Sequence, residues 1–193
     1  MRILPIAAVV STAALVGLAL LTRPSRVVAG TALRMDVPQL VAGAELVLEG
    51  RILSATALES PDGRIETEFL LQVERTFAGA DEPFRAVRIP GGVLEDGRGM
   101  LLAGMPVLRA GEDTLLFLSQ EGETGVRMPV GLAQGKFSVH RLADGKKSLT
   151  QDAAGISLVN EQGVLLSGQG GTVRDYAQVV AEIEAALAAR KAR

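Results

Sequence analysis

The residues from 64 to 77 alternate almost without a break between apolar and polar side chains. Ile65, Thr67, Phe69, Leu71 and Val73 fall on one side of this alternation, and Glu66, Glu68, Gln72 and Glu74 fall on the other. Because successive side chains of a β-strand point to opposite faces, the pattern predicts one long strand. We expect the apolar face of that strand in a core and the glutamate-bearing face in water.

A second apolar run lies at residues 46–53, and Ser60-Pro61-Asp62-Gly63 supplies turn residues between the two runs. The pair therefore predicts a long β-hairpin. Gly50 interrupts the first strand of this hairpin, which indicates a bulge or a sharp bend at a place where the sheet curls.

The β pattern continues along the chain, with strands predicted at 84–89, 114–118, 136–142 and 148–150. The run 114–118 is apolar throughout, as is typical of a central strand that is buried on both faces. Six or seven strands with frequent turns predict a mainly β fold over residues 36–150. The curled first hairpin favours a single small barrel, OB-like, of about six strands.

The first thirty residues form a separate segment, in which residues 3–21 are apolar or small and carry no charge. Two interpretations of this N-terminal hydrophobic helix stay open. A signal peptide cleaved after Ala29 fits the positive start and the small residues before the cleavage point. An uncleaved membrane anchor fits the length, since such a run at ~1.5 Å per residue just crosses the hydrocarbon layer of a bilayer.

Three further segments flank the β region. Residues 35–44 predict a short helical turn that Asp36 caps and Gly43 closes. Residues 151–171 predict a linker with one weak strand at 156–159, and residues 172–193 predict a C-terminal amphipathic α-helix that Thr172 caps. The expected apolar stripe of this helix is Val173, Tyr176, Val180, Ile183 and Leu187. The stripe fits packing on the barrel and also fits binding to a partner.

Composition excludes several classes of site. The chain has no cysteine and a single histidine, which excludes disulfides, thiolate metal sites and any site that needs two imidazoles. Its net charge of −2 argues against a general nucleic-acid binder. His140 alternates with Phe137 and Val139 and is expected on the solvent face as an ordinary surface residue.

No recognisable catalytic constellation occurs in the sequence. Gly97-Arg98-Gly99 lacks the spacing of a phosphate-binding loop, and Glu95-Asp96-Gly97 lacks the spaced oxygen ligands of a calcium loop. The glutamates at 66, 68 and 74 raise a hydrolase or metal interpretation, but such residues on one strand face are more often solvated. We therefore assign no catalytic, cofactor or metal residue and expect a non-enzyme without a cofactor.

Residues 91–104 form a long, glycine-rich and partly apolar connection inside the β region. Connections of this kind are unusual in compact domains and often carry function. A flexible crossover between strands is the plainer interpretation. If the protein has a binding site, we expect it in this segment.

Three stretches together resemble a group of uncharacterised exported bacterial proteins: 44–52, the strand from Thr67 to Phe77 with Ala78-Gly79 after it, and 111–118. More distantly, their order over residues 44–142 is similar to the OB-like barrel of netrin-type and metalloproteinase-inhibitor domains. The inhibitors of that class use an N-terminal cysteine and several disulfides, which this chain lacks. The resemblance therefore implies the barrel shape and carries no inhibitory residue over.

Together these features predict an exported protein, periplasmic or extracellular, or one tethered in the cytoplasmic membrane by residues 3–21. We expect a non-catalytic binding module whose partner is another envelope or extracellular protein, with no binding to nucleic acid. Two alternatives stay open. One is a small-ligand carrier with an open barrel interior, and the other is a carboxylate-dependent hydrolase.

Overall fold

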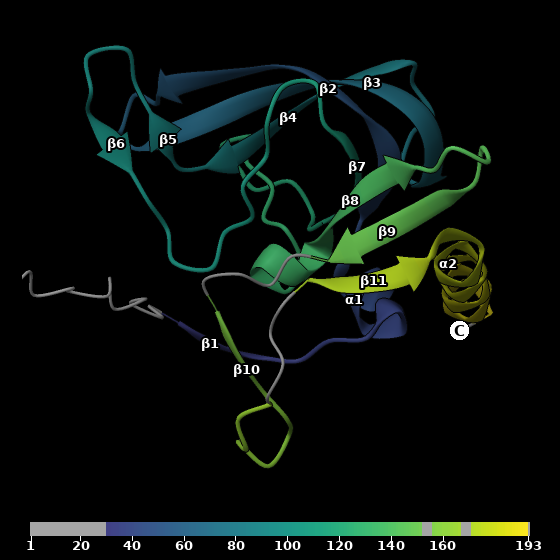
Figure 1. Ribbon diagram of the computed structural model, residues 1–193. Coiled ribbons are helices and arrows are strands. Elements are labelled where there is room, and N and C mark those ends of the chain that lie inside the picture. Colours follow the sequence, from purple (N-terminus) through teal and green to yellow (C-terminus); the bar gives the residue numbers. More distant parts are fainter. Residues whose placement is uncertain (1–29, 152–155, 167–170, 193) are drawn as a thin grey trace, which may run out of the picture.

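A computed structural model describes residues 30–151, 156–166 and 171–192 of the chain (Figure 1). The expected signal peptide or anchor lies outside these residues, apart from Gly30. Within the described ranges, no helix is both long enough and apolar enough to cross a membrane.

The chain forms a mainly β fold with two helices in the described residues. The strands are β1 (Thr31–Leu33), β2 (Leu46–Glu59), β3 (Ile65–Ala78), β4 (Phe84–Pro90), β5 (Gly92–Val93), β6 (Gly99–Met100), β7 (Asp113–Leu118), β8 (Lys136–Arg141), β9 (Lys147–Gln151), β10 (Ser157–Val159) and β11 (Thr172–Asp175). The α-helices are α1 (Val37–Gly43) and α2 (Tyr176–Lys191), and a short 3₁₀ helix, η1, covers Leu132–Gly135.

Seven strands form one antiparallel sheet in the order β11-β9-β8-β7-β2-β3-β4. The predicted hairpin is its longest pair, β2 with β3, and the turn at Pro61–Gly63 joins them as expected. The register shifts between Glu49 and Gly50, which confirms the predicted bulge. A Cβ atom on Gly50 would lie 2.4 Å from the Gln72 carbonyl oxygen, so only glycine lets the two strands approach this closely.

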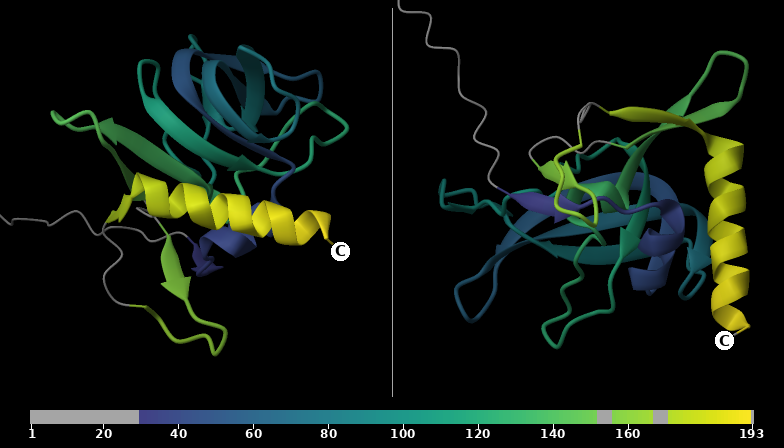
Figure 2. Two further views of the ribbon diagram at one scale, coloured as in Figure 1. Left: turned by 90° about the vertical axis from the view of Figure 1, so that its right-hand side faces the viewer. Right: turned by 90° about the horizontal axis from the view of Figure 1, so that it is seen from below.

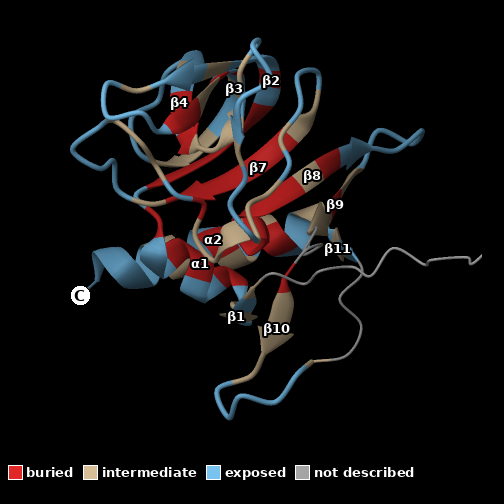
Figure 3. Ribbon diagram, turned by 90° about the vertical axis from the view of Figure 1, so that its left-hand side faces the viewer, coloured by how far each residue is buried: buried red, intermediate tan, exposed pale blue. Residues whose placement is uncertain are grey.

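The sheet curls and has an apolar cluster on each face. The first cluster lies between the sheet and the two helices, which pack side by side across one end of the sheet (Figure 2). The second lies inside the curled half formed by β2, β3, β4 and β7. Strand β7 is buried from Thr114 to Leu118 and contributes side chains to both clusters, as its apolar run predicts (Figure 3).

The predicted closed barrel is wrong, because the sheet does not close. Strands β8, β9 and β11 extend the sheet away from β4 instead of returning to it. Within the described residues, 126–129 lie between β4 and β7 and form single bridges, from Val126 to Arg88 and from Pro129 to Leu118.

Two predictions about the C-terminal segment need correction. A C-terminal helix is present, but residues 172–175 extend the sheet as β11 and Asp175, not Thr172, caps the helix by accepting a hydrogen bond from the Gln178 N–H. The buried residues of α2 are Val179 and Ile183. Val173, which was expected in the apolar stripe, lies on β11 and is exposed.

The expected separation of apolar and acidic faces holds only in part. Phe69 and Leu71 are buried as predicted, but Glu66 is buried as well. Glu74 is exposed and Glu68 is only partly exposed. The curl explains the difference, because it covers parts of a face that a flat two-layer sheet would leave in water.

Replacing Gly50 should test the close approach of β2 and β3. We expect Gly50→Ala to lower the free energy of unfolding by ~1–3 kcal/mol, because the new methyl group must displace backbone. Gly122→Ala is the control, since the nearest atom to its new Cβ would be 3.4 Å away. Urea unfolding of both variants measures the effect, and equal stability of the two would contradict the close approach.

Candidate functional site

A buried carboxylate lies at the junction of the sheet and the helix α2. Glu49 on β2 is 2% exposed, and its neighbours along the strand are apolar core residues. The Lys147 ammonium group donates to one carboxylate oxygen at 2.5 Å, and the Tyr176 hydroxyl donates to the other at 2.5 Å. Lys147 also lies over the Tyr176 ring, 5.1 Å from its centroid. These contacts supply the partners that a buried charge requires.

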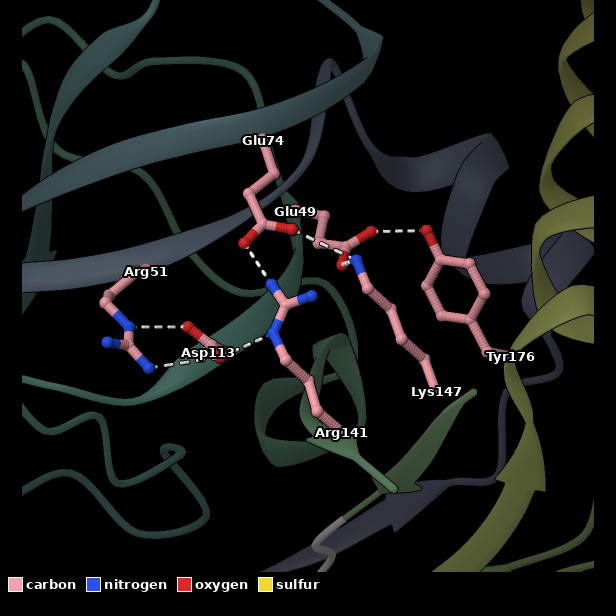
Figure 4. A network of polar contacts seen from close by, with 7 residues as sticks. All are labelled: Glu49, Arg51, Glu74, Asp113, Arg141, Lys147 and Tyr176. Carbon is pink, nitrogen blue, oxygen red and sulfur yellow. Dashed lines mark hydrogen bonds and ion pairs between the residues drawn. The ribbon is translucent and has the colours of Figure 1, made fainter. Parts of the chain in front are cut away.

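The network continues from Glu49 across the sheet as a row of alternating charges, which we name the charge ladder (Figure 4). Its members are Tyr176, Glu49, Lys147, Glu74, Arg141, Asp113 and Arg51. Lys147 lies 3.0 Å from Glu74, which also pairs with Arg141. The Asp113 carboxylate lies 3.5 Å from Arg141 and 2.8 Å from Arg51, and so joins these two residues. The ladder thereby links β2, β3, β7, β8, β9 and α2.

Contacts within the charge ladder shift the pKa values of Lys147, Tyr176 and Asp113. Burial alone would lower the pKa of Lys147, but its hydrogen bonds to Glu49 and Glu74 outweigh burial and raise the pKa. Burial and the hydrogen bond to Glu49 raise the pKa of Tyr176. The hydrogen bond from Arg51 lowers the pKa of Asp113 against the effect of burial. All three shifts move away from neutral pH, opposite to the tuning that general acid–base catalysis requires.

A hollow of about 310 Å³ opens beside one end of the ladder, between β2, β3, β7 and β8. Arg51, Glu74, Asp113 and Arg141 supply its charges, and each has an oppositely charged partner in the ladder. A ligand that bound one of these groups would have to break an existing ion pair. The arrangement therefore favours a structural role for the ladder.

The other residues weighed from the sequence do not come together. His140 is exposed, as predicted. Glu68 pairs with Arg88 on β4 at 3.1 Å and takes no part in the ladder, whereas Glu95 lies exposed in the turn between β5 and β6. No group of three or more acidic or histidine residues within the described ranges could hold a metal ion.

A second hollow, of about 240 Å³, lies at the glycine-rich segment where a binding site was expected. The floor comes from β3 and the end of β4, with Phe69 and Ile89, and the wall comes from the chain that follows β6. Its lining is apolar and includes Leu101, Leu102 and Val107. Leu101 is 89% exposed, the largest value for a large apolar side chain in the described residues.

Polar contacts anchor the chain segment beside this apolar hollow at two places. The Thr67 hydroxyl donates to the Gly91 carbonyl at 2.6 Å, and a Cβ atom on Gly92 would lie 2.3 Å from the same hydroxyl oxygen. Glycine is therefore required where the chain leaves β4. At the far end, Arg98 donates two hydrogen bonds to Glu59, at 2.9 and 2.7 Å, and so ties the β5–β6 hairpin to the end of β2.

The sequence interpretation missed the charge ladder because its members are far apart in the chain. Tyr176 and Glu49 are separated by 127 residues, and Tyr176 was expected only as a member of an apolar stripe. One local signal was available. Glu49 is the only charged residue between Leu46 and Gly50, and a charge inside an apolar strand indicates a buried partner.

Comparisons with known proteins add no relative. No protein-family model, curated protein or solved structure matches the chain. The resemblance to exported bacterial proteins and to OB-like inhibitor domains therefore stays a prediction.

Removing the ammonium group of Lys147 should destabilise the protein far more than removing that of its neighbour Lys146. We expect Lys147→Met to lower the free energy of unfolding by ~3–5 kcal/mol, because the buried Glu49 carboxylate loses its cationic partner. Lys146→Met is the matched control, since the Lys146 side chain is 78% exposed and should change stability by no more than ~0.5 kcal/mol. Equal effects of the two substitutions in urea unfolding would show that the ladder does not stabilise the fold.

The raised pKa values of Lys147 and Tyr176 predict how stability depends on pH. A raised pKa means that the protonated form favours the folded state, so this contribution is complete below the unfolded value of about 10. The contribution is lost as the pH rises through the folded values. We therefore expect the free energy of unfolding to fall above about pH 10.

The variant Tyr176→Phe tests this dependence, because it removes one of the two titrating groups. Its alkaline loss of stability should be smaller than that of the unaltered protein when both are followed by urea unfolding at several pH values. An unchanged alkaline profile in Tyr176→Phe would contradict a role for Tyr176 in the alkaline loss of stability.

The lowered pKa of Asp113 acts at the other end of the pH range. Its contribution to the free energy of unfolding is present above about pH 4 and is lost as the pH falls below that value.

Proposed function

We propose that the protein is a non-catalytic binding module, exported or tethered at a membrane, and that its contact surface is the apolar hollow beside residues 91–108. One observation carries the proposal. Leu101 is almost fully exposed at the rim of an apolar hollow, and its neighbour Val107 is 59% exposed. Clustered exposed apolar side chains of this kind mark binding surfaces more often than they mark catalytic sites.

Two features support binding over catalysis. The charged residues of the ladder are paired with one another, and the pKa shifts of Lys147, Tyr176 and Asp113 do not favour proton transfer at neutral pH. The apolar hollow contains no titratable side chain. A carboxylate-dependent hydrolase would need a carboxyl group beside a substrate cavity, and the apolar hollow offers none.

The carrier alternative has less support than the contact surface. The interior of the curled half is filled by buried side chains, among them Ile52, Leu71 and Leu116, which are each fully buried. A ligand would therefore have to lie in a surface hollow, such as the rim hollow of about 240 Å³, and not in the centre of the curl.

Site-specific photocross-linking tests the proposed contact surface. A photoreactive residue in place of Leu101 is expected to form one dominant adduct, with lipid or with one protein, in cells that produce the protein. The same residue in place of Leu142 is the control, because Leu142 is 48% exposed and follows β8 at the hairpin on the opposite side of the molecule (Figure 1). Equal adducts at both positions would contradict the proposal, and so would substrate turnover by the purified protein.

A further inference from the structure

Six exposed apolar side chains lie in segments that are close to Gly30, the first described residue. These side chains and their exposed fractions are Leu33 46%, Leu101 89%, Leu102 38%, Val107 59%, Val164 58% and Leu165 66%. We name this set the apolar face. Three of its residues belong to the wall of the apolar hollow, and the other three lie in β1 and in the chain after β10.

Contacts in the structure hold the two halves of the apolar face together. The Gly104 carbonyl accepts a hydrogen bond from the Ala133 N–H at 2.8 Å. Ile156 packs against Gly104 so closely that a Cβ atom there would lie 2.3 Å from an Ile156 methyl group. The next residue, Ser157, donates its N–H to the Gly30 carbonyl at 2.9 Å. Gly30 therefore lies beside the loop that carries Leu101.

Backbone pairing also fixes the second half of the apolar face, which lies in β1 and in the chain after β10. β1 and β10 pair in parallel, with Leu33 opposite Val159, and Val159 also forms a bridge with Leu165. A small buried cluster that contains Ala133 and Ile156 packs against β1 and β10 from the side of the loop. Figure 1 shows β1 and β10 on the same side of the molecule as the chain that follows β6. The apolar face thus surrounds the point at which the described chain begins.

We propose that the apolar face is a second membrane contact, by which the folded domain lies against the bilayer surface next to its N-terminal segment. The inference rests on the proposed function and names the bilayer as the partner of that contact surface. Residues 3–21 are the apolar run expected in a membrane, and eight residues separate Leu21 from Gly30. Eight residues reach at most about 30 Å, so a membrane-bound run would hold Gly30 near the bilayer.

The charges around the apolar face agree with a lipid surface. Arg34 and Arg109 are exposed beside Leu33 and Val107, and neither side chain has an ion pair within the described residues. Arginines next to exposed leucines suit the boundary between acyl chains and anionic headgroups. Glu161 offsets part of this positive charge, so burial of apolar surface should dominate the binding and high salt should weaken it only slightly.

Single-cysteine labelling tests this inference in the full-length chain, because the chain has no native cysteine. Leu101→Cys, Leu165→Cys and the control Leu142→Cys each receive an environment-sensitive fluorophore. The proteins are mixed with vesicles of phosphatidylcholine and phosphatidylglycerol, with and without a quencher on the acyl chain. We expect a blue shift and quenching at positions 101 and 165, retained at high salt, and neither effect at position 142.

The outcomes separate the inference from the proposed function. A label at position 101 that stays in water, or equal quenching at all three positions, would overturn the membrane contact. If the label stays in water while the photocross-linker at position 101 captures one protein, the contact surface stands and its partner is a protein. If neither experiment gives a signal at position 101, both the proposed function and the membrane contact are wrong.

Discussion

The buried carboxylate of Glu49 is the interaction on which the rest of the structure depends. A carboxyl group that is 2% exposed requires close polar partners, and here the two partners come from β9 and from the start of α2. The pair therefore fixes where the C-terminal helix begins relative to the sheet. Removing Lys147 or Tyr176 would leave that carboxylate without one of its two partners and loosen the contact between α2 and the sheet.

The same arrangement explains how much of the fold the sequence could predict. Local signals were sufficient for the β2–β3 hairpin, the bulge at Gly50 and the buried strand β7, because each depends on neighbouring residues. Local signals could not show whether the sheet closes into a barrel. Whether the outer edge of β4 is paired depends on residues 126–129, about forty residues further along the chain, which form one bridge to β4 and one to β7. The start of α2 was also missed, because β11 gains its hydrogen bonds from β9 and not from its own sequence.

The candidate site likewise has one part that the sequence predicts and one part that depends on the fold. The glycine-rich segment was predicted from composition alone, and an apolar hollow lies there. The charge ladder could not be predicted, because its residues come from six elements that only the folded sheet brings together. The two regions differ in kind, since the ladder satisfies its own charges while the apolar face leaves leucine side chains in water. The cluster of exposed apolar side chains around Leu101 is the observation on which the proposed contact surface rests.

Hydrogen exchange of backbone amides, measured with and without lipid vesicles, tests most directly whether the apolar face binds while the charge ladder stays structural. We expect vesicles to slow exchange in residues 99–108 and in β1 and β10, and to leave the strands of the charge ladder unchanged. Slower exchange around Arg51, Asp113 and Arg141, with none at the loop, would contradict it. That result would make the charged hollow, and not the apolar face, the surface at which this protein works.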